Sequence, residues 1–210
     1  MRWSVESHEY IGRMEPSPAE LEKIYSQYTD AELVHIATRS AHHLRPEALA
    51  VIRGMLRARN VDEAVFQGID AAVQPVDEAR VQEQVALIRS LPCPECGNRS
   101  APLNAVLASR AISFLVMTSY DRTPYIGCLP CLERRCTKAT WTSALAGWWG
   151  FPWGPVRTIQ AVIQNHSQKG ALRTGLPSET MVAFVVENTG KIEAYKGRPQ
   201  ELLTMITAPL

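Results

Sequence analysis

Four of the five cysteines in this chain fall in two CxxC pairs, and this arrangement constrains the fold more than any other feature. Cys93 and Cys96 form the first pair, and Cys128 and Cys131 form the second. Two cysteines at this spacing can bring both sulfurs to one metal ion when the loop between them turns tightly. Gly97, directly after the first pair, supplies the backbone freedom that such a turn needs. The spacing therefore predicts one metal site with four thiolate ligands.

A CxxC pair can also be a thiol–disulfide redox centre. The pairs flank segments that suggest short strands and turns, without a thioredoxin-like βαβ pattern, which favours the metal interpretation. Because four protein ligands leave no position for an activated water, we expect one structural zinc ion per chain and no catalytic metal. Cys136 is the odd thiol, and we expect it to be a packed helix residue.

Residues 1–92 carry a predominantly helical pattern. Ser17-Pro18 is typical of a helix start, and Thr29 and Glu32 have the spacing of a capping box. Further helices are expected from Pro46 to about residue 60, over 61–73 and over 77–91. Pro92 then ends the last helix before the first cysteine pair.

The whole chain predicts an α+β protein in four parts: a helical region (1–92), a four-cysteine β zinc ribbon (93–136), a tryptophan-rich helical elbow (137–175) and a C-terminal hairpin with a helix (176–210). Within the ribbon, 111–117 is predicted as a buried strand and 120–124 as a turn, with helical periodicity from Leu132. Near the C-terminus, 181–186 and 191–195 flank Asn188-Thr189-Gly190, which predicts a β-hairpin.

The segment LAGWWGFPWGP (145–155) predicts a sharp aromatic elbow between two helices. Cys136, Trp141, Leu145 and Trp148 approximate one face of the first helix, and Val156, Ile159, Val162 and Ile163 one face of the second. Trp148, Trp149 and Trp153 are either a plug in the core or an exposed binding surface. We expect partial burial, with at least one of the three holding the elbow against the ribbon and another reaching the surface.

The charge is unevenly distributed although the chain as a whole carries only +1. Residues 97–175 hold nine Lys/Arg against two Asp/Glu. This excess indicates a surface for nucleic acid, anionic lipid or an acidic partner, or else a surface on which the acidic N-terminal part docks. The candidate partner-binding residues are Arg134, Arg135, Lys138, Trp148, Trp149, Trp153 and Arg157.

Several function classes lack their sequence patterns. There is no glycine-rich phosphate loop, nucleophile elbow or HExxH motif, so we expect no enzyme and no small-molecule substrate. No apolar run reaches the roughly 18 residues of a spanning helix, and no signal peptide is predicted. Cysteines paired for metal binding suit a reducing compartment. The expected location is the cytoplasm, with peripheral attachment to the inner membrane left open.

Several motifs together resemble a known group of proteins. CPECG and IGCLPC, followed by LAGWWGFPWGPVRTIQAVIQN, resemble uncharacterised bacterial zinc-ribbon proteins with a GWWGxPWGxxxT signature, and TDAELVHIATRSAHHLRPEALAVIRGMLRARN resembles the helical stretch that precedes their ribbon. The resemblance covers roughly two thirds of the chain. It implies a bacterial origin and a zinc ribbon but no reaction. Some members carry more hydrophobic neighbouring segments, which implies proximity to a membrane.

These observations favour a non-enzymatic zinc-ribbon binding or adaptor protein that docks to a protein partner or to an anionic membrane surface. The alternative is a ribbon-type nucleic-acid-binding protein, because aromatic and basic side chains together can also bind exposed bases.

Overall fold

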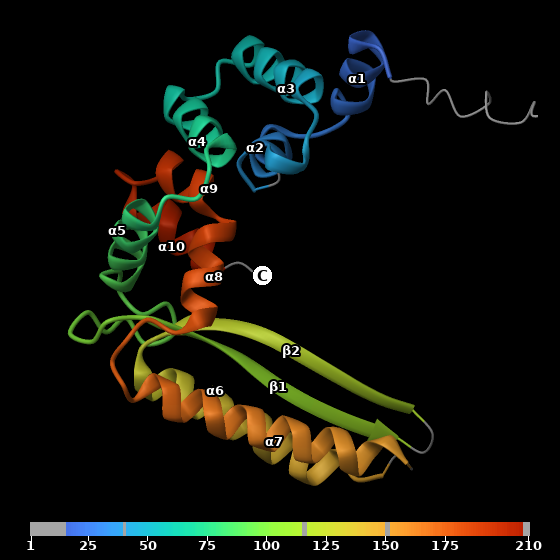
Figure 1. The fold of residues 1–210 in the computed structure, drawn as a ribbon, viewed down its shortest axis with the longest axis vertical. Coiled ribbons are helices and arrows are strands. Elements are labelled where there is room, and N and C mark those ends of the chain that lie inside the picture. Colours follow the sequence, from blue (N-terminus) through green and yellow to red (C-terminus); the bar gives the residue numbers. More distant parts are fainter. Residues whose placement is uncertain (1–15, 40, 115–116, 150–151, 208–210) are drawn as a thin grey trace, which may run out of the picture.

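The computed structural model describes residues 16–39, 41–114, 117–149 and 152–207. These residues form ten α-helices, one short 3-10 helix and a two-stranded antiparallel sheet. The predicted α+β class is therefore confirmed, and helices dominate (Figure 1).

The N-terminal helices begin where local capping rules place them. Ser17 and Glu20 form a capping box at the start of the first helix, and Thr29 and Glu32 exchange the same pair of hydrogen bonds at the start of the second. The elements are α1 (Pro18–Tyr25), α2 (Asp30–Arg39), η1 (Ala41–His43), α3 (Pro46–Ala58), α4 (Glu63–Val73) and α5 (Glu78–Arg89). The apolar faces of α2, α3 and α4 meet in one cluster that includes Leu33, Ile52 and Ile69.

The sheet is one long hairpin of β1 (Asn104–Phe114) and β2 (Met117–Gly127), with Asn104 opposite Gly127 and Phe114 opposite Met117. The turn predicted at 120–124 is wrong, because these residues lie within β2. Pro124 is tolerated there because a strand in a two-stranded sheet has a free edge, where a missing N–H breaks no ladder bond. The connection between the strands, residues 115–116, lies outside the described residues.

Helices α6 (Leu129–Ala146) and α7 (Trp153–Leu172) run side by side along the hairpin and both contact β1 (Figure 1). We call β1, β2, α6 and α7 the arm. Near its far end, the Ser113 hydroxyl of β1 donates a 2.8 Å hydrogen bond to the carbonyl of Gly147, directly after α6. The helix expected from Leu132 begins three residues earlier, and the predicted boundary at residue 136 falls inside α6.

The predicted C-terminal β-hairpin is wrong. The region forms α8 (Glu179–Glu187), α9 (Thr189–Ala194) and α10 (Pro199–Thr207). Gly190 is not a turn residue but a close-packing residue, since a Cβ there would lie 2.6 Å from the Gly68 carbonyl oxygen of α4. Asn188 is buried, and its amide donates to the Phe184 carbonyl, so the side chain that suggested a turn caps a helix end instead.

The C-terminal helices pack against the N-terminal ones, α9 on α4 and α8 on α5. Together these helices make a helical body from which the arm projects (Figure 1). A second apolar cluster, including Ile88, Leu103 and Met181, joins the body to the base of the arm. Cys93, Cys128 and Cys131 belong to this cluster.

Candidate metal centre and tryptophan surface

The four cysteines of the CxxC pairs come together at the base of the arm. Cys93 and Cys96 lie in the loop between α5 and β1, Cys128 directly precedes α6, and Cys131 lies in its first turn. Their sulfurs all lie within 4.8 Å of one another. The predicted four-cysteine metal site is therefore present as a cluster.

The spacing of the sulfurs fits a single tetrahedral ion. With metal–sulfur bonds of about 2.3 Å, the edges of a regular sulfur tetrahedron measure about 3.8 Å. The Cys96 and Cys128 sulfurs are 3.6 Å apart. Three of the cysteines are buried and Cys96 is exposed, so the site is closed toward the core and reaches the surface on one side.

The first cysteine loop has the backbone that a metal-binding turn requires. The Gly97 N–H donates to the Cys93 carbonyl, and the Cys93 N–H donates to the Asn98 carbonyl, both at 2.8 Å. Gly97 has a φ of 72°, in the left-handed region that glycine adopts without strain. The expected role of Gly97 is confirmed.

The environment differs among the thiols. Burial raises the pKa of Cys128 and Cys131 above the ordinary cysteine value. Burial also acts on Cys93, but backbone N–H groups around its sulfur, that of Cys128 foremost, lower its pKa to about 7. The Cys128 N–H lies 3.4 Å from that sulfur. One thiolate is thus favoured by the fold, and a bound cation would favour ionisation of the others.

Glu95, between the first two cysteines, ties their loop to α6. Its carboxylate is 3.0 Å from the Arg134 guanidinium and 3.4 Å from that of Arg135. Arg134 also points to the Cys131 sulfur at 3.8 Å. Two of the predicted partner-binding cations therefore lie beside the metal centre. No role was predicted for Glu95, although its position between two cysteine ligands could have indicated one.

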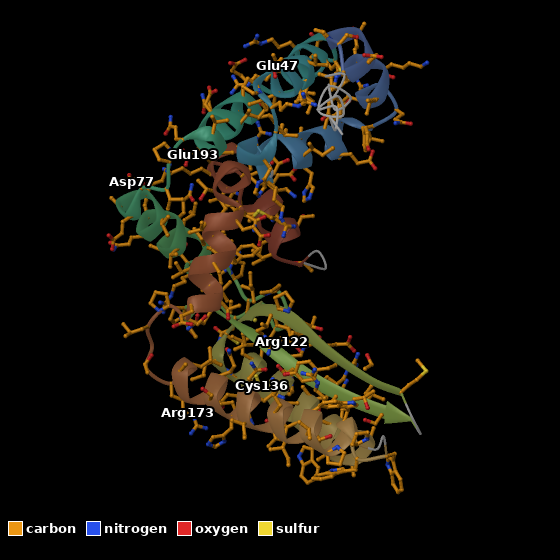
Figure 2. All side chains as sticks on the ribbon, turned by 45° about the vertical axis from the view of Figure 1, so that its right-hand side comes forward. Glu47, Asp77, Arg122, Cys136, Arg173 and Glu193 are labelled. Atoms are coloured by element: carbon orange, nitrogen blue, oxygen red, sulfur yellow. The ribbon has the colours of Figure 1, made fainter. Side chains whose placement is uncertain are left out.

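Cys136 is separate from this cluster. It is fully buried with Val106, Leu132 and Leu172, and burial raises its pKa (Figure 2). The expectation of a packed helix residue is confirmed.

The three tryptophans of the elbow are all exposed. Trp148, Trp149 and Trp153 expose 49%, 72% and 63% of their surface. The expectation that one of them reaches the surface is confirmed, and the expectation that at least one holds the elbow against the ribbon is wrong. The inner faces of α6 and α7 leave no room for such a ring, because they approach each other and β1 through small residues.

Glycines of the GWWGFPWG motif make this approach possible. A Cβ on Gly147 would lie 2.0 Å from the Thr158 hydroxyl oxygen, and one on Gly154 would lie 2.6 Å from the Gly147 carbonyl oxygen. Both positions therefore exclude any side chain. The motif positions the turn between the helices and leaves the rings outside.

Polar groups complete the inner faces. The Asn165 side chain both accepts from the N–H and donates to the carbonyl of Ser109, each at 2.8 Å. The Ser143 hydroxyl accepts from the Ala111 N–H at 2.9 Å. Both helices thus satisfy backbone groups on the free edge of β1, which explains why small polar residues rather than large apolar ones lie inside.

Several large apolar residues of the two helices and of the turn between them face outward. We call them the tryptophan surface, which consists of Trp141, Leu145, Trp148, Trp149, Trp153, Val156, Ile159 and Ile163, each 49–72% exposed. The predicted face of the first helix is wrong, since Cys136 is buried and Trp141 is not. No binding role was predicted for the other five members, Trp141, Leu145, Val156, Ile159 and Ile163, because an apolar stripe normally marks the core. The small and polar residues on the opposite side of the helices, such as Gly147, Ser143 and Asn165, could have indicated that this opposite side packs on the sheet.

The helices of the arm carry an excess of cations. Residues 134–178 include six Lys/Arg and no Asp/Glu. Arg157 lies over the Tyr120 ring of β2, while Arg173 lies at the end of α7 nearest the helical body (Figure 2). Among the described residues, no partner is found for the ammonium group of the exposed Lys138.

None of the described helices has the length and apolar character needed to cross a bilayer. No protein-family model, curated protein or solved structure matches the chain. The resemblance carried by the sequence motifs therefore stays an expectation.

Proposed function

We propose that this chain is a non-enzymatic docking protein that attaches to an anionic membrane surface through the tryptophan surface, while a structural zinc ion holds the base of the arm. The observation that carries the proposal is the orientation of α6 and α7. These helices and the turn between them hold eight large apolar side chains on the outside, and the helices bury small and polar ones such as Ser143, Thr158 and Asn165. Large exposed apolar side chains gathered on two neighbouring helices typically mark an interaction surface.

The size of the patch is sufficient for attachment. A tryptophan that inserts about 100 Å² of exposed ring gains about 2.5 kcal/mol at 25 cal/mol per Å². The four tryptophans of the patch would then contribute about 10 kcal/mol before the ordering of side chains is subtracted. Tryptophan is also the residue type favoured at the membrane–water boundary.

The charge of the arm favours a bilayer with anionic lipids over a second copy of the chain. Each Lys or Arg close to such a surface adds about 1 kcal/mol of attraction. A dimer through the same patch would instead bring two cation-rich helix pairs together, and their like charges would repel. An acidic protein partner would satisfy the same charges, and it is an outcome of the test below.

Nucleic-acid binding is less well supported by the arrangement of the rings. Stacking surfaces alternate aromatic rings with cations along a groove. Arg135 and Arg157 instead lie over Tyr125 and Tyr120 of the same arm, and the tryptophan surface contains no cation.

The donor set supports zinc as the metal. Four thiolates in tetrahedral spacing select zinc or iron among the common ions, and zinc needs no redox partner and closes its coordination with protein ligands alone. A hairpin preceded by one cysteine pair and followed by the other is also typical of a zinc ribbon, although here the second pair continues into α6. Held by the ion, the loop after α5 and the start of α6 would give the arm a rigid base.

Vesicle flotation tests the proposal. The chain should float with phosphatidylcholine vesicles that contain phosphatidylglycerol, less so without it, and release as salt rises. Trp149→Ala/Trp153→Ala should abolish flotation and retain the metal. Val76→Ala, which changes an equally exposed apolar residue of the helical body, is the matched control and should float normally. Absence of flotation combined with a salt-sensitive oligonucleotide gel shift would favour nucleic acid, and absence of both would favour a protein partner.

A further inference from the structure

A small cavity of about 220 Å³ lies between the hairpin and α6. Its polar lining consists of Arg110, Thr123, Tyr125, Arg135, Lys138 and Thr142. We call it the basic pocket. No carboxylate lines it.

Cations outnumber carboxylates around the basic pocket. Asp121 lies 3.5 Å from Arg110, with both side chains half exposed, and such a pair is weak in water. Glu95 is shared between Arg134 and Arg135. Two carboxylates thus face four cations, and the fourth, Lys138, has no ion-pair partner among the described residues.

Hydrogen-bond donors in the basic pocket are also available. The hydroxyls of Thr123 and Tyr125 have no hydrogen-bond partner in the described part of the chain. The Arg135 guanidinium lies 4.9 Å from the centre of the Tyr125 ring, which orients it along the pocket wall. Charged and neutral donors that converge without a carboxylate suit an oxyanion.

The volume limits the kind of anion. Pockets for drug-sized ligands usually measure about 300–1,000 Å³, and this one is smaller. It suits a single compact group such as a phosphate and not a nucleotide base or an extended peptide.

The basic pocket adjoins the tryptophan surface. Lys138 and Thr142 line the pocket, and each lies three residues before a member of that surface, Trp141 and Leu145. Residues three apart are neighbours on a helix. One flat partner can therefore meet both features at once.

We propose that the basic pocket binds the phosphate group of an anionic lipid headgroup while the tryptophan surface inserts beside it. This inference rests on the proposed membrane docking and specifies its ligand. Arg110 and Lys138 provide charge from opposite walls, Arg135 provides the planar donor pair, and the two hydroxyls complete the contacts.

The test compares two double variants that remove equal charge. Arg110→Gln/Lys138→Gln alters the pocket, and Arg122→Gln/Arg157→Gln alters two arm cations outside it, both over Tyr120. Vesicles are made in digalactosyldiacylglycerol with either phosphatidylglycerol or oleate at matched surface charge, so that only one kind carries phosphate. Metal content and far-ultraviolet circular dichroism establish that both variants are folded.

The intact chain should prefer phosphatidylglycerol vesicles over oleate vesicles by about tenfold, as expected for one or two charge-assisted contacts. The pocket variant should lose this preference, and the control variant should weaken on both vesicles but keep it. Equal binding of the intact chain to both vesicles, or an unchanged preference in the pocket variant, would overturn the inference.

A solution titration separates this inference from the proposed function. Glycerol phosphate should shift the amide signals of residues 108–110, Thr123 and Tyr125 in NMR spectra of the intact chain but not of the pocket variant. If vesicles do not bind and these signals still shift, membrane docking fails while the pocket is a phosphate site for a soluble ligand, which overturns the lipid assignment. If vesicles bind without phosphate preference or shifts, docking stands and the pocket inference fails.

Discussion

The helical body and the arm use amphipathic helices in opposite ways. In the body, large apolar residues such as Leu33 and Ile52 are fully buried between helices. In the arm, residues of the same type face outward, and Ser143, Thr158 and Asn165 lie inside. The difference teaches that an apolar stripe marks the face that avoids water, which is the core in the body and, on our proposal, a membrane in the arm.

Loss of the metal should produce the largest effect and should act on the arm before the body. A structural zinc site contributes on the order of 10 kcal/mol to the fold around it. Purified protein should contain about one zinc per chain by elemental analysis. Chelation or Cys93→Ser/Cys128→Ser should collapse hydrogen-exchange protection in β1, β2 and the start of α6, while α2 to α4 stay protected.

Cys136→Ser is the control for this experiment, because it removes a buried cysteine outside the cluster and should keep the zinc. Protein that contains iron would contradict the choice of metal. If the purified protein contains no metal and the double variant keeps full stability, the four cysteines do not form a structural metal site.

Truncation of one apolar residue in each region should give the next largest difference, in the free energy of unfolding. Ile52→Ala, in the body, should lower the free energy of unfolding by about 2–5 kcal/mol because it leaves a cavity. Trp149→Ala, in the arm, should lower it by less than about 1 kcal/mol because the ring is mostly exposed. Urea denaturation measures both, and equal losses would mean that the tryptophan is part of a core.

Glycine substitutions in the arm should distinguish close packing from free surface. Gly147→Ala should destabilise the arm by about 1–3 kcal/mol, because its Cβ would overlap Thr158 and the Ser143 carbonyl. Gly170→Ala, in α7, meets nothing within 4 Å and should stabilise by about 0.5–1 kcal/mol. Thermal unfolding of both variants checks this, and a neutral Gly147→Ala would contradict the tight turn.

The smallest predicted effect concerns the link between the two regions. The Ser178 hydroxyl caps α8 by accepting from the Met181 N–H, and it donates to the Ala105 carbonyl of β1 at 2.6 Å. Ser178→Ala should destabilise the protein by about 1 kcal/mol. Ser167→Ala, on the exposed side of α7, is the control and should be near neutral. A similar value for both variants would show that this contact does not couple body and arm.

Local chemistry was enough to predict the helix starts and the metal ligands. A capping box such as Thr29 and Glu32 acts within one helical turn, and a CxxC pair presents two sulfurs from one short loop, so neither depends on distant residues. The sequence also predicted that the two CxxC loops meet, because four thiolates complete a tetrahedral site that two leave open.

Distant contacts decided the remaining features. Asn188-Thr189-Gly190 has the composition of a turn, yet Gly190 serves the contact with Gly68, more than a hundred residues earlier in the chain. Likewise, periodicity shows that α6 and α7 have an apolar side but not which side packs on β1. That choice followed from the edge of β1, whose N–H and carbonyl groups require polar partners such as Ser143 and Asn165, and from the glycines that allow them to approach.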